Sequence, residues 1–234
     1  LKSGEIHSLS ESTSEDRSDV SNYQYIVTQL SPVLYNQYWG VYFNLRLDPS
    51  GNSIAPEFLL DKNVRQAISM AINREEIIQS ALMGAAEEAY GPISSNSIYF
   101  NPNANWNTYN LQKASELLDA AGWTIKNGAT IRKNSDNLPM EFSLYFLESY
   151  DRDNIATIIE QDLLKVGIRV IINRQEQQDY LSNASNTPKG WSLEELTSQV
   201  LAPRAFDALI FGMNTFIDPD RFELFHSSQT DYPK

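Results

Sequence analysis

Residues 140–172, M-E-F-S-L-Y-F-L-E-S-Y-D-R-D-N-I-A-T-I-I-E-Q-D-L-L-K-V-G-I-R-V-I-I, contain the pattern that decides the fold. Apolar residues alternate along 140–147, which predicts a strand with one buried face made by Phe142, Leu144 and Phe146. Residues 152–166 carry apolar side chains at helical spacing, and Gly167 is placed to end that helix. Residues 168–172 predict a second strand directly after it. A strand, a helix and a strand in succession favour an α/β domain.

Upstream of this unit, the sequence predicts two strands and three helices. Aromatic and β-branched residues favour strands over residues 23–30 and 38–47. The spacing of apolar residues predicts helices over residues 62–71, 74–83 and 111–121. Each helix follows a side chain that can cap its first turn, namely Asp61, Asn73 and Asn110. The second and third helices are followed by glycines suited to a C-terminal cap, Gly84 and Gly122.

The remaining segments predict loops, a hairpin and the end of the sheet. The polar segments 8–21 and 90–108 are expected to be loops. Asn127-Gly128 favours a hairpin over residues 125–131, because this dipeptide suits a type I′ turn. Downstream we expect a strand over residues 206–213 and helices near 176–182, 192–200 and 220–226. This order of elements predicts an α/β fold with a mixed sheet flanked by helices.

The composition excludes several classes of protein. The chain has 234 residues, of which 41% are hydrophobic, and no apolar run long enough to span a membrane. Its formal net charge of −12 argues against a nucleic-acid partner, which requires a basic face. Because the chain has no cysteine, disulfides, thiolate metal sites and cysteine nucleophiles are excluded.

No group of residues in the sequence predicts catalysis. The adjacent acids Glu75-Glu76 and Glu194-Glu195 fall in first helical turns, where carboxylates interact favourably with the helix dipole. Asp218, Asp220 and His226 have the residue types of a metal site, but we interpret the acids as caps of the short helix 220–226. A hydrolase needs a nucleophile beside a base, and no Gly-x-Ser-x-Gly motif is present. We therefore expect a protein that is not an enzyme and that needs no metal or cofactor.

Aromatic residues near predicted loops form the better candidates for a functional surface. Trp and Tyr suit recognition because they offer a large contact area with little rotamer entropy. We interpret Tyr42 and Trp123 as packing residues. Tyr38, Trp39 and Trp106 lie near loops and are candidates for contact with a ligand.

Several segments resemble one known family in collinear order. These segments are Phe43-Asn-Leu45, Asp61–Ile78, Tyr109–Trp123, Leu163–Val170, Phe206–Gly212 and Asp218-Pro-Asp220. They are similar to the family 5 extracellular solute-binding proteins, which are oligopeptide-, dipeptide- and nickel-binding receptors of ABC importers. The Val-Arg-Gln-Ala-Ile stretch at 64–68 and the Leu-Leu-Asp-Ala-Ala-Gly-Trp stretch at 117–123 are the most specific matches.

The resemblance implies a fold, a location and partners. The fold would be one lobe of a type II periplasmic-binding-protein-like clamp, with residues 1–37 a remnant of the first lobe and its connection. Residues 38–234 would be the second lobe, truncated at its C-terminal end. The protein would be an extracytoplasmic monomer that delivers a peptide or another small solute to a membrane permease, and its signal sequence would lie outside this chain. A solute-sensing domain of a regulatory protein is the alternative.

The resemblance also implies site residues in the loop after the last strand. Peptide-binding members carry a Trp after the Gly that corresponds to Gly212, and an Asp that pairs with the ammonium group of the ligand. Met213 replaces the Trp, and Thr215 occupies the position of the Asp, so Asp218 is left to supply the charge. A sugar-like ligand or a metal complex is the alternative to a peptide. The expected ligand-binding residues are Gly212, Met213, Asn214, Thr215, Asp218, Tyr38 and Trp39.

Overall fold

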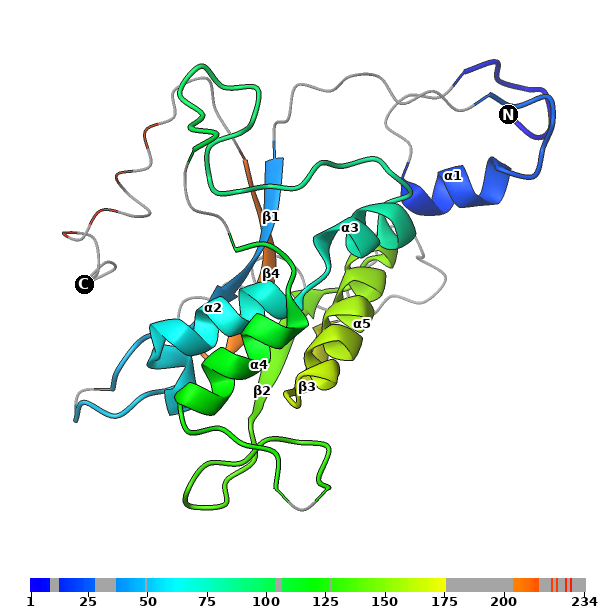
Figure 1. Cartoon of the computed structure of the whole chain (residues 1–234). Helices are drawn as coiled ribbons and strands as arrows, with labels where there is room; N and C mark the ends of the chain where they lie inside the picture. Colours follow the sequence, from blue (N-terminus) through cyan, green and yellow to red (C-terminus); the bar gives the residue numbers. More distant parts are fainter. Residues whose placement is uncertain are drawn as a thin grey trace, which may run out of the picture.

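The computed structural model describes most of the chain and shows a sheet with helices against it (Figure 1). The described residues are 1–8, 13–27, 37–48, 50–103, 107–126, 128–175 and 204–214, with the single residues 220, 222, 226 and 228. In Figure 1, the helices α2, α4 and α5 lie on one side of the sheet. Within the described residues, no helix has the length and apolar character needed to cross a membrane.

The sheet has four strands in the order β1-β4-β2-β3. Their bounds are β1 Gln37–Phe43, β2 Glu141–Leu147, β3 Arg169–Gln175 and β4 Ala208–Asn214. β1 runs antiparallel to β4, whereas β2 runs parallel to both β3 and β4. The predicted α/β fold with a mixed sheet flanked by helices is therefore confirmed.

The unit quoted at the start of the sequence analysis forms β2, α5 and β3. α5 spans Tyr150–Lys165 and begins two residues before the predicted helix, because the Ser149 side chain accepts a hydrogen bond from the Arg152 N–H and caps it. Gly167 has a φ of +82°, as its place after the helix predicts. The predicted apolar face of β2 is buried against the helices, with Phe142, Leu144 and Phe146 almost without solvent exposure.

α2 and α4 form the second layer of the core and lie against each other. α2 spans Lys62–Ala71 after the cap Asp61, and α4 spans Leu111–Ala120 after the cap Asn110. Both caps and both helices agree with the sequence prediction to within a residue. A short helix, η1 at Glu57–Leu60, precedes α2 and buries Phe58 and Leu59.

The helix predicted over residues 74–83 is only partly α-helical. α3 covers Arg74–Glu76, and it continues as the wider π-type turn η2 at Ile77–Ala81. The Leu82 N–H bonds to the Ile77 carbonyl, five residues back, rather than four. Gly84 has a positive φ of +74°, which agrees with its predicted role as a cap.

Two structural predictions within the first 30 residues, the loop over 8–21 and the strand over 23–30, are wrong where the structure describes them. A helix, α1 at Ser14–Val20, forms within the expected loop, because Thr13 and Asp16 make a reciprocal capping box at its start. Residues 23–27 form turns instead of a strand, with the Ile26 N–H bonded to the Tyr23 carbonyl. Residues 28–30 of the predicted strand lie outside the described residues.

Two further elements, a strand and a hairpin, are shorter in the structure than the sequence predicts. β1 ends at Phe43 and not at residue 47, because the Asn44 side chain donates to the carbonyls of Arg204 and Phe206. The predicted hairpin is reduced to a single bridge between Thr124 and Lys133 in the described residues. The helices predicted near 176–182 and 192–200 lie outside the described residues.

Candidate ligand-binding site

Three strands have their ends together at one end of the sheet, which we call the carboxyl edge. This surface runs across the ends of the strands and not along an outer strand. β2 and β4 are parallel, so their carboxyl ends meet there, and the antiparallel β1 brings its amino end to the same place. Three cross-strand pairs mark this edge: Gln37 with Asn214, Tyr38 with Met213, and Trp39 with Gly212. Open α/β sheets bind ligands beyond the carboxyl ends of their strands. Five of the seven residues expected from the sequence are thus brought together at this edge.

The five residues nevertheless point to two different faces of the sheet. Successive side chains of a strand alternate between faces, so Tyr38 and Trp39 lie on opposite faces. The Tyr38 hydroxyl donates to the sulfur of Met213 across the strands at 3.2 Å. Trp39 lies on the other face with its partner Gly212. A ligand that contacts both aromatic rings must therefore lie across the ends of the strands and not along one face of the sheet.

Gly212 is required by its close neighbours on the Trp39 face. A Cβ atom at this position would lie 2.9 Å from the amide nitrogen of Gln37 and 3.0 Å from the Trp39 ring. The Trp39 indole N–H donates to the Gln37 side chain at 3.0 Å, and 40% of Trp39 remains exposed. The absence of a side chain at residue 212 thus leaves room for the side chains of Gln37 and Trp39 beside β4.

Arg152 is a member of this site that our sequence analysis missed. Its guanidinium carbon lies 5.3 Å from the centre of the Trp39 ring, within the range of a cation–π contact. Its Nη2 donates to the Glu148 carbonyl at 3.2 Å. The signal that could have revealed it is a basic residue in the first turn of a helix, where the helix dipole disfavours a cation.

The two arginines at this edge differ in their ion pairs. Arg174, at the end of β3, forms ion pairs with Glu148 at 2.6 Å and with Asp153 at 2.8 Å. Arg152 makes no ion pair among the described residues. Burial lowers the pKa of Arg152, although the neighbouring Asp151 and Asp153 oppose that effect. The carboxyl edge therefore has one neutralised guanidinium and one that lacks a carboxylate partner in the described part of the chain.

The other face of β1 carries two neighbouring tyrosines, Tyr38 and Tyr42. Burial, together with the nearby Tyr38, raises the pKa of the Tyr42 hydroxyl. The Tyr42 ring lies against Gly40, 3.4 Å from the position of a Cβ there. The half-buried Tyr42 agrees with its interpretation as a packing residue, and Trp123 packs edge-on against Phe58 at 5.2 Å.

Several expected site residues lie outside the described residues. These are Thr215, Asp218 and the loop aromatic Trp106. His226 is described, and its ring stacks on Phe222 at 4.3 Å. In the described ranges, no group of three or more His, Cys, Asp and Glu side chains is arranged to hold a metal ion. The roles expected for Thr215 and Asp218 thus stay predictions.

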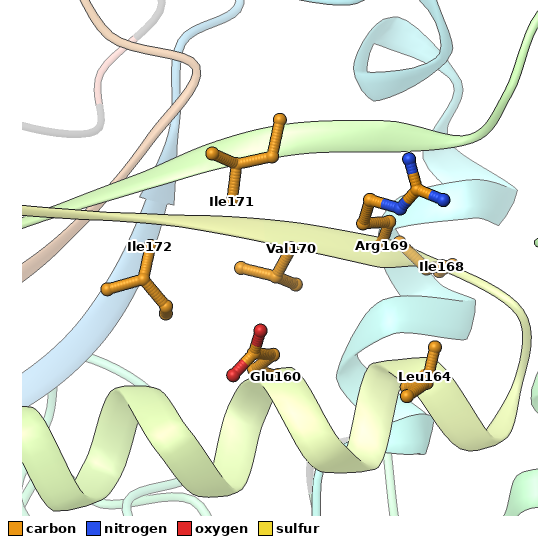
Figure 2. Close-up of a pocket in the computed structure, with 7 residues that line it drawn as sticks. All are labelled: Glu160, Leu164, Ile168, Arg169, Val170, Ile171 and Ile172. Carbon is orange, nitrogen blue, oxygen red and sulfur yellow. The ribbon is translucent and has the colours of Figure 1, made fainter.

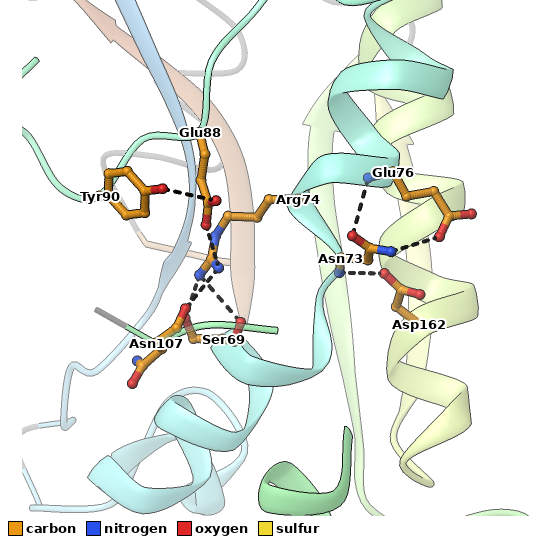
Figure 3. A network of polar contacts seen from close by, with 8 residues as sticks. All are labelled: Ser69, Asn73, Arg74, Glu76, Glu88, Tyr90, Asn107 and Asp162. Carbon is orange, nitrogen blue, oxygen red and sulfur yellow. Dashed lines mark hydrogen bonds and ion pairs between the residues drawn. The ribbon is translucent and has the colours of Figure 1, made fainter. Parts of the chain in front are cut away.

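A polar network behind the carboxyl edge has a structural role (Figure 3). Arg74 donates to the hydroxyl of Ser69 at 2.7 Å, to the carbonyl of Asn107 at 3.0 Å, and pairs with Glu88 at 3.3 Å. It therefore fastens two loop segments to the end of α2. Arg74 is therefore a structural contact between a helix and two loops, with its side chain partly buried.

The adjacent acids Glu75-Glu76 behave as the sequence suggests. The Asn73 side chain accepts the Glu76 N–H at 3.2 Å, and the Glu75 carboxylate accepts a hydrogen bond from Gln79. The Asn73 N–H in turn donates to the buried carboxylate of Asp162 on α5 (Figure 3). These carboxylates therefore take part in hydrogen bonds at the start of the helix that begins at Arg74.

A groove between α5 and β3 is a second concave surface (Figure 2). Figure 2 shows Glu160 and Leu164 pointing from α5 toward β3, whose residues 168–172 form the rest of the lining. The lining is mainly aliphatic, with one carboxylate and one guanidinium, that of Arg169. β2 and β4 separate this groove from β1, so it is distinct from the surface around Trp39.

Comparison with known proteins gives one family. The sequence model of the bacterial extracellular solute-binding proteins, family 5, middle region, matches residues 1–222. The oligopeptide-binding protein AppA of Bacillus subtilis is 31% identical over 176 residues, which cover 74% of this chain and 30% of AppA. The nickel-binding periplasmic protein of Escherichia coli is 28% identical over 144 residues, covering 61% of this chain and 27% of that protein. The chain thus spans less than a third of the length of these relatives.

Solved structures lead to the same family. The structure of AppA from Bacillus subtilis in complex with a nonapeptide has a TM-score of 0.62 at 28% identity, over 83% of this chain and 36% of AppA. The structure of NikZ from Campylobacter jejuni in complex with Ni(L-His) has a TM-score of 0.63 at 25% identity, over 82% of this chain and 33% of NikZ.

These findings confirm two expectations from the sequence. The fold is that of the family to which the motifs pointed, and that family consists of solute-binding proteins and not of enzymes. Because the family match extends over residues 1–222 and includes every described strand, the chain belongs to the bacterial extracellular solute-binding proteins of family 5.

Proposed function

We propose that this chain supplies part of the solute-binding surface of the extracytoplasmic receptor of an ABC importer. The observation that carries the proposal is the carboxyl edge, where a half-exposed indole and the amide side chains of Gln37 and Asn214 lie at the paired ends of β1 and β4. Such a surface can bind a solute without any catalytic group, since it offers an aromatic platform and polar groups that fix orientation. The family match supports the same role.

A peptide is the leading candidate for the solute. AppA is an oligopeptide-binding protein whose structure holds a nonapeptide, and NikZ was solved with Ni(L-His). Both of these ligands contain carboxylate groups. Gln37 and Asn214, paired at this edge, carry amide side chains that can hydrogen-bond to the main chain of an extended peptide whatever its own side chains are.

The proposed contacts divide between the described and the remaining site residues. Trp39, Gly212 and Asn214 would contact the solute on one face of the edge, and Tyr38 and Met213 would contact it on the other. Thr215 and Asp218 would complete the site from the loop after β4. In this proposal, residues 1–37 belong with a first lobe and residues 38–234 with a second, and the receptor is a monomer that passes its solute to a membrane permease.

This function can be tested by native mass spectrometry of the protein purified from the organism that produces it. The expected result is a co-purified peptide, which is lost when the protein is unfolded and refolded in clean buffer. A co-purified nickel complex would support the importer role and replace the peptide as substrate. A neutral oligosaccharide would contradict the substrate class, and a protein that retains no solute and binds neither peptide nor metal complex would contradict the function.

A further inference from the structure

The described parts of residues 1–27 are tied together by their own contacts. Lys2 forms an ion pair with Asp19 of α1, and its ammonium group lies over the Tyr23 ring, 5.1 Å from the ring centre. The Tyr23 ring in turn packs edge-on against Tyr25 at 5.7 Å. These contacts hold α1 in place relative to the residues before and after it.

α1 attaches this segment to the part of the chain that carries the sheet. It lies against α5, and Ser14 at its start is almost fully buried. The Arg17 guanidinium donates through Nη2 to the Ser14 hydroxyl and to the Leu82 carbonyl, each at 3.0 Å. Leu82 directly follows η2, so the second hydrogen bond joins residues 65 positions apart in the chain. Arg17 is therefore a specific contact between α1 and the end of η2 (Figure 1).

The hydrogen bond from Arg17 to Leu82 can open without leaving either group unpaired. The Leu82 carbonyl also accepts the Ala85 N–H at 3.0 Å, and Arg17 keeps its bond to Ser14 within the same helix. A buried acceptor that lost its only donor would make opening costly, and that cost is avoided here.

The turn that receives Arg17 is a surface turn and not part of the core. Met83, next to the Leu82 carbonyl, has a φ of +52°, a left-handed conformation that residues other than glycine rarely adopt. Its side chain is 39% exposed. The contact is therefore made to a short turn at the surface, where it can form and break while the sheet and its helices stay intact.

We propose that the hydrogen bond from Arg17 to the Leu82 carbonyl is a latch between the two lobes that slows release of the solute. This inference rests on the proposed function, in which α1 belongs with the first lobe and η2 with the second. In that arrangement the latch forms only while the lobes lie close together. A contact made in one state raises the population of that state. The latch and a bound solute therefore favour the same closed state, and each stabilises the other.

The first measurement follows the movement of α1. Spin labels are attached to Glu15→Cys on α1 and Lys62→Cys on α2, both at exposed positions of a segment without natural cysteines. Any cysteine elsewhere in the full-length receptor is replaced first. The distance between the labels is measured in the receptor with its co-purified solute and after that solute has been stripped. We expect one short distance with solute, and a second, longer distance without it.

The second measurement is the rate at which the receptor releases its co-purified solute. The solute-loaded fraction is followed by native mass spectrometry after dilution into clean buffer. The variants are Arg17→Gln and Arg17→Lys. The matched control is Arg169→Gln, which removes an arginine that is paired with Glu141 on the surface, far from α1 in the fold.

The expected result is faster release without slower binding. Arg17→Gln should release the solute about three- to tenfold faster, the effect of losing one charge-assisted hydrogen bond. Its association rate should stay unchanged, because the latch forms after the solute has bound. Arg17→Lys should restore part of the natural rate, since an ammonium group can also donate to a carbonyl. Arg169→Gln should behave as the natural protein.

Three outcomes overturn the inference. If the distance between the labels is the same with and without solute, α1 is fixed to the second lobe and no latch exists. If Arg17→Gln lowers the thermal midpoint of the solute-free protein but releases solute at the natural rate, the contact is structural only. If the receptor carries no solute and binds none, the proposed function fails, and the latch fails with it because there is no bound state to prolong.

Discussion

At the scale of the residue, Arg132 joins the ends of two helices. Its side chain is only 4% exposed, and it donates to the carbonyls of Val166 and Trp123 at 2.7 Å each. It also pairs with Asp119 at 2.5 Å. These acceptors belong to the last turns and the exits of α4 and α5, where helix carbonyls lack partners within the helix. One guanidinium thus satisfies groups of both helices.

Replacing Arg132 by Met should therefore destabilise the protein strongly. We expect a loss of about 3 kcal/mol in the free energy of unfolding, because buried carbonyls lose their donors. Arg169→Met removes an exposed arginine whose ion pair with Glu141 lies on the surface, and it should cost less than about 1 kcal/mol. Denaturant titrations of both variants measure the difference, and equal losses would show that Arg132 has no special role.

Lys165 gives the protein a predicted sensitivity to alkaline pH. Its hydrogen bond to the buried Asp162 raises the pKa of its ammonium group above the ordinary value of 10.5. A raised pKa in the folded state means that the stabilisation is complete below the unfolded pKa and is lost as the pH rises through the folded pKa.

Comparing the natural protein with Lys165→Met tests whether this stabilisation is lost as the pH rises. Below about pH 10, the natural protein should be more stable than the variant by a constant amount, measured as the free energy of unfolding. Above pH 10.5 the difference should shrink, because deprotonated Lys165 leaves Asp162 without its cation. A difference that stays constant to pH 12, or that grows, would contradict the assignment.

At the scale of the element, two helices end in the same way but in different surroundings. Gly122 follows α4 with a φ of +84°, and a Cβ atom there would meet nothing within 4 Å. Gly167 follows α5 with a φ of +82°, and a Cβ atom there would lie 2.9 Å from the Arg132 side chain and 3.3 Å from the Thr130 carbonyl. Gly122 is required only because its backbone has a positive φ. Gly167 is required for the same reason and also because its neighbours leave no room for a side chain.

Alanine substitutions separate these two requirements. Gly122→Ala should lower the free energy of unfolding by about 1 to 2 kcal/mol, the cost of a left-handed conformation. Gly167→Ala should cost at least about 1 kcal/mol more, because the added methyl group also displaces its neighbours. Thermal or denaturant unfolding measures both. If Gly122→Ala proved the more damaging change, the packing around Gly167 would have to be looser than the structure shows.

At the scale of the whole molecule, the sheet has two ends with different roles. The carboxyl edge gathers strand ends, an exposed indole and Arg152, whereas the opposite end of β3 carries an arginine already paired with Glu141. The groove of Figure 2 runs along β3, at the end of the described strand order. The proposed function uses only the carboxyl edge.

Hydrogen exchange with and without the co-purified solute should show this division. Solute should slow amide exchange in residues 37–40, 148–152 and 211–214, because a ligand stabilises the state that binds it. Exchange in residues 168–172 should change little. Protection that instead centres on residues 160–172 would move the binding site to the groove between α5 and β3.

Much of the fold could be predicted from the sequence because its signals are local. The N-caps Asp61 and Asn110, the glycines after the helices and the alternation in β2 each act over a few residues, and the structure agrees with them. A local signal failed in β1, which stops where Asn44 bonds to carbonyls some 160 residues away. In α1 the capping box of Thr13 and Asp16 is itself a local signal, but the polar composition of the segment suggested a loop.

The candidate site was only partly predictable for the same reason. Tyr38, Trp39 and the residues after Phe211 could be selected as candidates, but their pairing across β1 and β4 is a matter of strand register. Side chains alternate between faces along β1, so Tyr38 and Trp39 lie on opposite faces. The position of α5 on the sheet brings Arg152 to Trp39, although it lies more than 100 positions later and no motif singled it out.

The sequence by itself determined the family, the α/β fold class and the capped helices, because side-chain periodicity and capping act between neighbouring residues. Only the tertiary structure decided which face each candidate residue occupies and which charges remain without a partner. Those properties depend on contacts between strands and helices far apart in the chain. The cation–π contact of Arg152 with Trp39 exists only because parallel and antiparallel strands bring their ends to one edge of the sheet.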